Sequence, residues 1–251
     1  MQIPVIRGII DRRILVNFRV DPEALARLVP APFRPKLVNG AGMAGVCLIR
    51  LKNIRPRFLP PWFGISSENA AHRLAVEWDQ DGETREGVFI PRRDTSSRIN
   101  TLLGGRFFPG VHHHAAFQVE ERDDHYRVAL DSDDGHTHLL VEGHLAQELP
   151  RTSAFRSLRE ASRFFERGSL GYSLTATPAQ LDALELRSFN WRVQPLAVEK
   201  LQSSFFEDQE LFPPGSVELD CALLMRGVEQ EWHGRGSLNV GCNRVPSIAT
   251  I

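Results

Sequence analysis

One segment of the sequence, residues 87–120, carries many side chains that can hold an anion or exchange a proton. It begins with an apolar run and turns polar around Arg92 and Asp94. It then continues through Arg106 to three consecutive histidines, His112–His114, which open a second apolar stretch. A guanidinium can bind a carboxylate through two parallel hydrogen bonds, and an imidazole exchanges protons near neutral pH. We therefore expect the floor of any site in this protein to lie here.

The arginines of this segment have two interpretations each. Arg106 follows a Gly-Gly pair that ends a predicted short helix, residues 99–103, so it could bind a ligand carboxylate or the helix's own carbonyl groups. Arg92 and Arg93 stand at a predicted strand end beside Asp94, and we expect at least one of them to pair with that carboxylate. For each of these arginines, both a contact with a ligand and a contact within the protein remain open.

The three histidines permit acid–base chemistry or metal binding. On a strand, His112 and His114 share one face, and His113 points to the other. A His-x-His pair with a third histidine, such as His138 or His144, would suit a three-nitrogen zinc site. The sequence places no third ligand and no supporting carboxylate, however. We therefore predict neither a metal nor a cofactor, and keep a histidine-based metal enzyme as an alternative.

Composition excludes several classes of partner. The chain has 251 residues, 42% of them hydrophobic, and its formal net charge is −1, so no overall field attracts nucleic acid or a membrane. Of its 30 basic residues, only Lys36, Lys52 and Lys200 are lysines, so amine nucleophiles are scarce. The three cysteines lack metal-ligand or disulfide spacing and read as small buried residues.

No targeting or membrane segment is evident. The opening residues lack the charged and apolar regions of a signal peptide, and no apolar run nears the ~18 residues of a membrane span. We expect a cytoplasmic protein with a small-molecule ligand. The oligomeric state stays open, with a homo-oligomer formed through hairpin edges as one outcome.

The apolar patterns predict many strands and few helices. Asp21-Pro22 should begin one helix, residues 152–167 should form the longest helix, and residues 179–184 a short one. Strands are expected at residues 14–20, 43–51, 74–78, 88–90, 112–120, 127–130, 138–141, 186–191, 196–200 and 218–225. We predict a single α+β domain over residues 1–251, built on a large antiparallel sheet or barrel.

Four segments, in order, resemble the acetoacetate decarboxylase superfamily, closest to its DUF2071 (YqjF-like) family. They read NFRVDPEALARLVPAPF, SSENAAHRLAVEW, GVFIPRRD and GGRFFPGVHHHAAF. The resemblance runs from about Asp11 to Trp191. It implies a cone-shaped β-barrel with peripheral helices and an internal cavity.

The chain departs from the decarboxylases at their reactive lysines. The resemblance implies an imine-forming lysine whose pKa a second, adjacent lysine lowers. Counting from Arg106 places this pair at His113 and His114, whereas counting from Pro109 places it at residues 110 and 111. Neither position holds a lysine, so we expect no imine there.

Other pocket residues of the superfamily match only in part. Glu68 matches a glutamate that lines the decarboxylase pocket, although it could equally be a strand residue paired with a surface arginine. The pocket arginine near the first strand corresponds to Arg12, or the count falls on Asp11. The second pocket carboxylate finds only apolar residues or Arg50 here.

Together these patterns predict a cavity that binds a small organic acid or carbonyl compound, with any catalysis being acid–base. Only Lys52 or Lys200 reaching into the site would restore an imine. A non-catalytic binding protein is the other class that the sequence allows. We expect Phe89, Val111 and Trp62 to wall the cavity. The residues expected to act on the ligand are Glu68, His113 and His114, and those expected to bind it are Arg106, Arg92 and His112.

Overall fold

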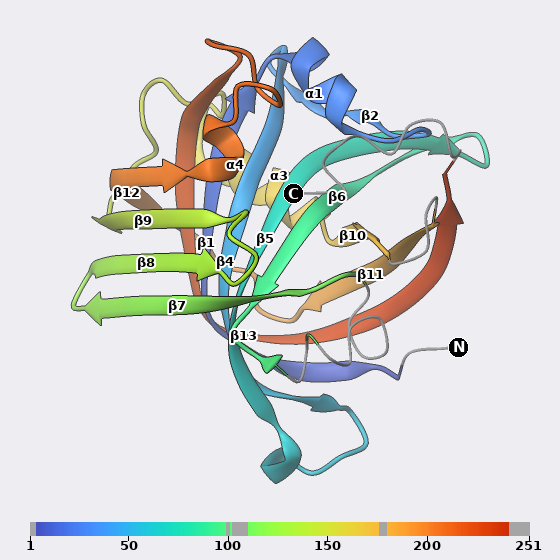
Figure 1. Ribbon diagram of the computed structural model, residues 1–251, viewed down its shortest axis with the longest axis vertical. Coiled ribbons are helices and arrows are strands. Elements are labelled where there is room, and N and C mark those ends of the chain that lie inside the picture. Colours follow the sequence, from blue (N-terminus) through green and yellow to red (C-terminus); the bar gives the residue numbers. More distant parts are fainter. Residues whose placement is uncertain (1–3, 99–100, 102–109, 176–179, 241–251) are drawn as a thin grey trace.

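The computed structural model describes residues 4–98, 101, 110–175 and 180–240. The chain forms a 13-stranded mixed sheet in this part, with few helices (Figure 1). The strands are β1 Ile6–Val20, β2 Arg34–Pro35, β3 Leu37–Val38, β4 Ala41–Pro56, β5 Ile65–Gln80, β6 Glu83–Thr95, β7 His113–Arg122, β8 His125–Ser132, β9 His138–Leu145, β10 Leu170–Leu174, β11 Gln180–Ser188, β12 Gln194–Ser203 and β13 Val217–Asn239. The helices are α1 Pro22–Leu28, η1 Pro61–Phe63, α3 Leu158–Arg167 and α4 Ser204–Glu207.

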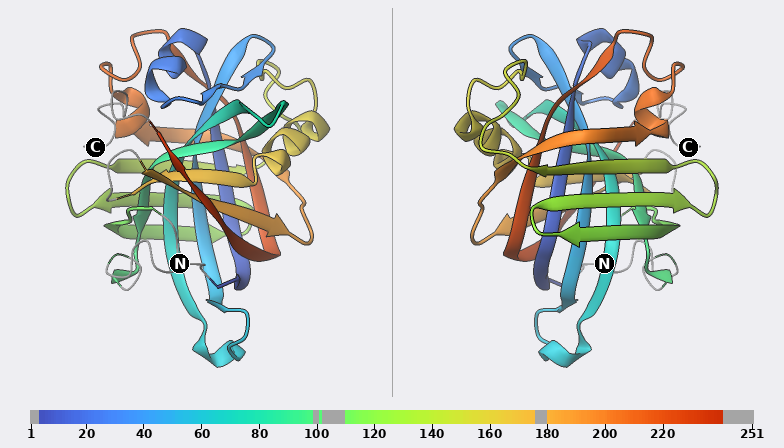
Figure 2. Two further views of the ribbon diagram at one scale, coloured as in Figure 1. Left: turned by 90° about the vertical axis from the view of Figure 1, so that its right-hand side faces the viewer. Right: turned by 90° about the vertical axis from the view of Figure 1, so that its left-hand side faces the viewer.

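The sheet closes into two rings that share five strands. β13, β1, β4, β5 and β6 pair side by side as a central sheet. One arm of β7, β8, β9 and β12 connects β6 to β13, and a second arm of β10 and β11 connects the same two strands. The two opposite views of Figure 2 each show one arm in front of the central sheet. The pairings of β6 with β7 and with β10 are parallel, and the others are antiparallel.

The central strands are buried on both faces, as the apolar run at residues 43–51 predicted. Neighbouring residues on one strand belong to different hydrophobic clusters: Val46 packs into one cluster and Cys47 into the other. Cys47 and Cys221 are buried free thiols, as expected, and Cys242 lies outside the described residues. Among the described residues, no helix combines the length and apolarity needed to cross a bilayer.

Local sequence signals predicted several element ends correctly. The Asp21 carboxylate caps α1 by accepting hydrogen bonds from the backbone N–H groups of Glu23 and Ala24. The turn at Asn39-Gly40 has positive φ at both residues, as does the turn at Asp81-Gly82 between β5 and β6.

Two predicted helices were wrong in whole or in part. Residues 180–184 form the start of β11, in which Leu181 and Ala183 alternate with more exposed neighbours and pair with β10 and β13. The helix predicted at residues 152–167 begins only after Ser157, because Asp220 accepts hydrogen bonds from the preceding turn at Ser153 and Ala154.

Two predicted strand ends also differ from the structure. The strand predicted to run to residue 191 ends at Ser188, and β13 extends to Asn239, far beyond the predicted residue 225. Residues 55–63, which include three prolines, contain the end of β4 and the 3₁₀ helix η1 at the tip of a projecting hairpin (Figure 2). The short helix predicted at residues 99–103 falls almost entirely outside the described residues.

Candidate functional site

Parallel pairing of β6 with β7 brings together the two polar segments that the sequence singled out. Asp94 lies opposite His113, and Thr95 lies opposite His114. A register shift between β5 and β6 places Arg92 opposite His72. The arginines at the end of β6 and the histidines at the start of β7 therefore meet at one junction of the central sheet and the β7–β12 arm.

A cavity of about 70 Å³ lies beside this junction. Its polar lining comes from Asn69, Arg93, Asp94 and His112, and its walls are mostly apolar. The lining residues are Ile10, Ile49, Leu51, Asn69, Ala70, Ala71, Arg93, Asp94, His112, Leu184, Leu186 and Trp232.

The expected walls of the cavity were wrong. Phe89 is fully buried in the hydrophobic cluster on the other side of the sheet, and Val111 is 40% exposed. Trp62 is 79% exposed at the tip of the β4–β5 hairpin. The apolar walls come instead from β1, β4, β5, β11 and β13, which meet only because the β10–β11 arm closes its ring.

Arg93 is the cation of the cavity. Its Nε donates a hydrogen bond to Ser173 Oγ at 3.0 Å, and no described carboxylate lies within ion-pair distance of its guanidinium. The adjacent Asp94 is bound by Arg92 instead. Burial lowers the pKa of Arg93 to about 10. The cavity thus contains a positive charge without a protein counterion among the described residues.

His112 is held as a neutral imidazole next to this charge. Its Nδ1 lies 3.2 Å from the carbonyl oxygen of Gly110, which can only accept, so Nδ1 carries the proton and Nε2 the lone pair. Burial, and after it the positive charge of Arg93, lower the pKa of His112 to about 3. His112 and Arg93 together offer a ligand one hydrogen-bond acceptor and several donors.

Arg92 belongs to a buried ion-pair group beside the cavity, as the sequence predicted for one of the two arginines. Arg92 Nη2 lies 2.8 Å from Asp94 and 2.9 Å from Asp134, and His113 Nδ1 lies 2.8 Å from Asp134. Burial raises the pKa of Asp94 even though Arg92 acts to lower it. Burial would also raise the pKa of Asp134, but hydrogen bonds from Ser132, the His136 N–H and Arg92 lower it well below its usual range.

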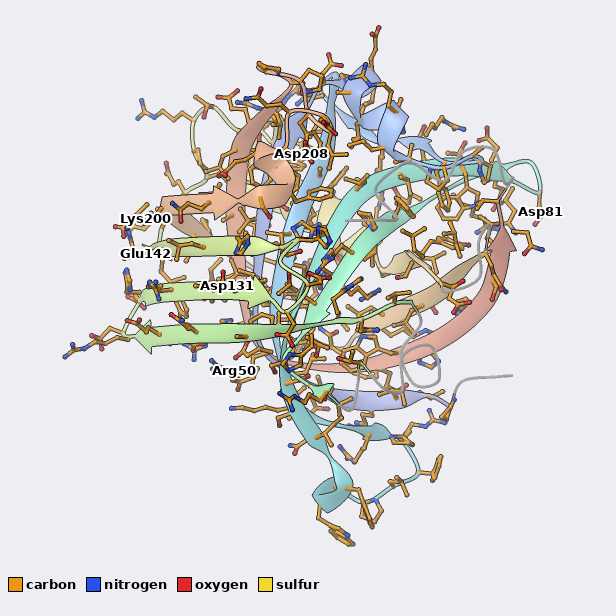
Figure 3. All side chains as sticks on the ribbon, in the orientation of Figure 1. Arg50, Asp81, Asp131, Glu142, Lys200 and Asp208 are labelled. Atoms are coloured by element: carbon orange, nitrogen blue, oxygen red, sulfur yellow. The ribbon has the colours of Figure 1, made fainter. Side chains whose placement is uncertain are left out.

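Glu68 lies in a separate ion-pair network and does not line the cavity, although its neighbour Asn69 does. The fully buried Arg12 donates to Glu68 at 2.6 Å and to Glu121 at 2.7 Å. Arg50, labelled in Figure 3, bonds the same two glutamates at 2.5 and 2.9 Å. We call these four residues the paired network, because two guanidiniums face two carboxylates.

The remaining predicted residues lie apart from one another. His114 Nδ1 contacts Asp133 at 2.8 Å, so the three histidines turn toward three different partners. Arg106 lies outside the described residues. The three lysines stand away from the cavity lining: Lys36 pairs with Glu86, Lys52 pairs with Asp11, and Lys200 is exposed on β12 (Figure 3).

Sequence reasoning missed one polar residue at this junction, His72. It is fully buried, and its ring lies 4.6 Å from that of Phe205. Within the described ranges, neither ring nitrogen has a hydrogen-bond partner. Burial lowers the pKa of His72 to about 3, with the Arg92 charge acting in the same direction. A lone histidine inside the apolar run AAHRLAV was the available signal.

Comparison with known proteins gives a family and a fold. Residues 10–229 match the DUF2071 family, which is described as an uncharacterized conserved protein. A search of curated protein sequences found no significant match.

Solved structures share the fold at low sequence identity. The acetoacetate decarboxylase from Legionella pneumophila is 13% identical, with a TM-score of 0.60, and the match covers 95% of this chain and 88% of that one. The enduracididine biosynthesis enzyme MppR complexed with pyruvate is 11% identical, with a TM-score of 0.57 and coverage of 94% and 91%. An acetoacetate decarboxylase-like enzyme from Sphingomonas wittichii RW1 is 12% identical, with a TM-score of 0.56 and coverage of 96% and 94%.

Proposed function

This chain belongs to the DUF2071 family, and on that premise we propose that it binds a small organic acid in the cavity beside Arg93 and His112. The observation that carries the proposal is the charge of Arg93, which has no carboxylate partner among the described residues, in a mostly apolar cavity. Removing a cation from water is costly unless an anion compensates it. A ligand carboxylate would supply that anion through charge-assisted hydrogen bonds.

The size of the cavity limits the ligand. One water needs roughly 10–15 Å³ of such space, so a cavity of about 70 Å³ holds a molecule of about five or six non-hydrogen atoms. A short carboxylic or oxo acid fits this size. One structural neighbour, MppR, is complexed with pyruvate, a molecule of this class.

His112 is the candidate for proton transfer to or from the bound acid. Its Nε2 lone pair is free to accept a hydrogen bond, while the Gly110 carbonyl fixes the ring. A carboxylate on Arg93 would cancel the second of the two main causes that lower the pKa of His112, the Arg93 charge, and so raise that pKa, while burial would still act to lower it. His113 and His114 are the next candidates, followed by Glu68 if the paired network opens. Because no lysine stands among the lining residues, we propose acid–base chemistry without an imine.

Thermal unfolding tests the binding site. Acetate and pyruvate should raise the melting temperature, and acetamide at the same concentration and ionic strength should not. At 100 times its Kd, a ligand adds about 2.7 kcal/mol, which for a chain of this size corresponds to roughly 5–10 °C. The substitution Arg93→Met should abolish the shift. The control Arg7→Met, which removes an exposed arginine of β1 that does not line the cavity, should leave the shift unchanged.

Two outcomes would reject Arg93 as the anion site. One is an equal shift with acid and amide, and the other is a shift that persists in Arg93→Met. Arg106→Gln is the second arm of the experiment, because the sequence alone favours Arg106 as the anion-binding residue. Loss of the shift in Arg106→Gln but not in Arg93→Met would transfer the role to Arg106.

Borohydride reduction tests the chemistry. Incubation with acetoacetate and borohydride should leave the protein mass unchanged, because an imine requires an amine at the site. A reduced adduct on Lys52 or Lys200 in the mass spectrum would contradict acid–base chemistry without an imine. Turnover of a small oxo acid by the wild type and its loss in His112→Gln, with binding retained, would separate an enzyme from a non-catalytic binding protein.

A further inference from the structure

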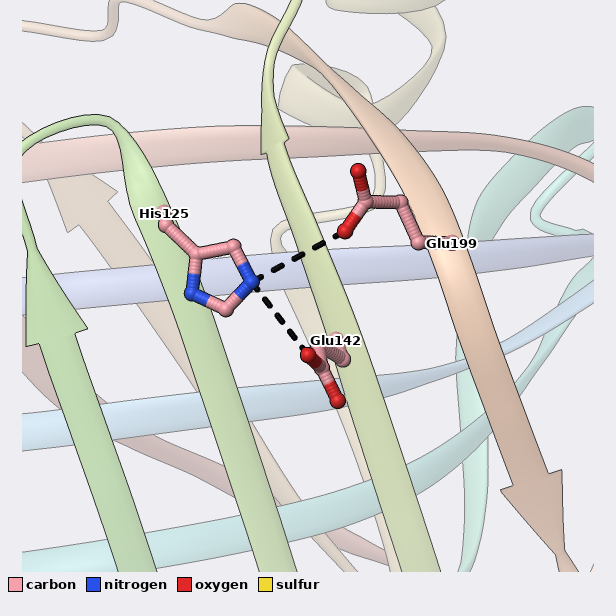
Figure 4. Close-up of side chains that lie close together, drawn as sticks. All are labelled: His125, Glu142 and Glu199. Carbon is pink, nitrogen blue, oxygen red and sulfur yellow. Dashed lines mark ion pairs between the residues drawn. The ribbon is translucent and has the colours of Figure 1, made fainter.

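The outer face of the β7–β12 arm brings one histidine and two glutamates together from three adjacent strands. His125 lies on β8, Glu142 on β9 and Glu199 on β12, and Figure 4 shows both carboxylates directed at one nitrogen of the imidazole. His125 Nε2 lies 3.4 Å from Glu142 Oε1 and 3.7 Å from Glu199 Oε2. All three side chains are at least a quarter exposed, so a solute can reach them.

These distances fit the coordination sphere of a metal better than hydrogen bonds. An N–H···O hydrogen bond spans 2.7–3.2 Å, and both contacts of His125 Nε2 are longer. In a tetrahedral zinc site with bonds of 2.0–2.2 Å, neighbouring ligand atoms lie about 3.3–3.6 Å apart. The distances from His125 Nε2 to the two carboxylate oxygens, 3.4 and 3.7 Å, are therefore close to the edge length of such a tetrahedron.

The second oxygen of each carboxylate faces another basic group, at hydrogen-bond distance for Glu199 and at the longer distance of an ion pair for Glu142. Glu199 Oε1 lies 2.9 Å from Nδ1 of His144, and Glu142 Oε2 lies 3.9 Å from Nε of Arg127. Groups that fix the far oxygen of a ligating carboxylate orient it and increase metal affinity. Glu199 thus turns one oxygen toward His125 and the other toward a hydrogen-bonded supporting group, His144.

The strand pairing explains how side chains from three strands converge on one point. His125 lies directly opposite His144 on the neighbouring strand. On β12 the register shifts between Val198 and Lys200, so Glu199 is the extra residue of a bulge. Bulges redirect side chains, often next to functional sites.

We propose that His125, Glu142 and Glu199 bind a divalent zinc ion on the outer face of this arm. His125 would contribute Nε2, and each glutamate one oxygen, with water at the fourth position. The ion would link β8, β9 and β12 and so stabilise the arm that closes the first ring. The site is independent of the cavity beside Arg93, and it uses none of the histidines at residues 112–114.

Zinc binding to untagged, chelator-treated protein tests the proposal by calorimetry and by melting temperature at pH 7.5. We expect one saturable equivalent and a higher melting temperature with zinc. Both effects should disappear in His125→Ala and in Glu199→Gln, which keeps the side-chain shape. His144→Ala should weaken binding by about 10–100-fold, as expected for loss of a supporting group.

His138→Ala is the matched control. Like His144, His138 is an exposed histidine of β9, and it lies 2.7 Å from the carboxylate of Asp131. It is not near the three proposed zinc ligands. Zinc binding should be unchanged in this variant. The proposal is overturned if zinc does not saturate, if binding survives either ligand substitution, or if His138→Ala removes it as well. Melting in the absence of zinc shows whether each variant is folded.

Discussion

Two polar regions of the interior differ in whether their charged side chains have counterions in the protein. In the paired network, Arg12 and Arg50 are each bonded to both Glu68 and Glu121. Beside it, in the part of the chain that the structure describes, Arg93 lines a cavity without a carboxylate partner and His72 has no hydrogen-bond partner. The charges of the first region are compensated within the protein, although Arg12 Nε has no hydrogen-bond partner among the described residues, whereas the charge of Arg93 is not compensated by the described residues.

This difference separates a role in folding from a role in binding. The paired network joins β1, β4 and β5 of the central sheet to Glu121 on β7, so it helps to fasten the β7–β12 arm. A complete network offers a ligand little, because each guanidinium already has its carboxylates. The unpaired group costs stability in the free protein, and a ligand with the opposite charge recovers that cost.

Arg12→Met should have the largest effect on stability. It leaves Glu68 paired with Arg50 alone among the described residues. Glu121 keeps Arg50 and the more distant Arg226, at 3.7 Å. Breaking a buried pair by removing one partner typically costs about 3–5 kcal/mol. The free energy of unfolding from urea titration measures the loss. Arg7→Met, which removes an exposed arginine paired with Glu229, should change it by less than about 1 kcal/mol. Similar losses in the two variants would show that the network is not special.

His72→Phe should reduce the acid sensitivity of the fold. The pKa of His72 is about 3 in the folded protein and near 6.5 when unfolded, so the unfolded chain takes up the proton first. Stability present above pH 6.5 is therefore lost as the pH falls toward 3, by roughly 3 kcal/mol between pH 7 and pH 4. Urea titrations at both pH values should show that the loss between pH 7 and pH 4 is smaller by roughly 3 kcal/mol in the variant than in the wild type, which keeps both His72 and His112. The exposed His138→Gln serves as control, and equal acid losses in wild type and His72→Phe would refute the prediction.

Arg93→Met should leave the free energy of unfolding unchanged or raise it by up to about 2 kcal/mol, because it removes a cation that has no protein counterion. This is the opposite sign to Arg12→Met, although both substitutions replace an arginine of the protein interior with methionine. Urea titration without ligand is the measurement. A loss above about 2 kcal/mol would mean that Arg93 has a stabilising partner and that the contrast between the two regions fails.

Lys52→Met should have the smallest effect. Lys52 is 48% exposed at the edge of the paired network, where it contacts Asp11 at 2.9 Å. Exposed pairs of this kind contribute about 0.2–1 kcal/mol, and added salt should remove most of that contribution. A loss comparable to that of Arg12→Met would show that the network extends to the surface.

The parts of the fold that sequence predicted correctly depend on neighbouring residues. Asp21-Pro22 starts a helix, and Asn39-Gly40 makes a turn, because their own side chains and φ angles decide the outcome. Residues 180–184 were assigned wrongly, since their strand forms by pairing with β10 and with β13, which lies far along the chain. Local propensity does not contain that information.

The sequence predicted where the candidate site lies, but not which side chains line it or how they pair. Residues 91–94 and 112–114 do meet, because β6 and β7 are close in sequence and pair directly. The partners of Glu68 and the walls of the cavity come from β1, β7, β11 and β13, and ring closure decides their positions. The sequence also could not distinguish Arg92, which is paired, from Arg93, which is not, because one residue changes the face of the strand.

The double ring has a consequence for how the chain is made. Both rings need β13, and its partner β1 is at the other end of the described chain: Asn17 and Cys221 contact each other across 204 residues. Contacts so distant in sequence slow folding, because the loop between them must close first. At 5–20 residues per second, a ribosome needs roughly 10–40 s to make that intervening length. During that time β1 waits without its partner, and its exposed edge makes the nascent chain a candidate client for chaperones.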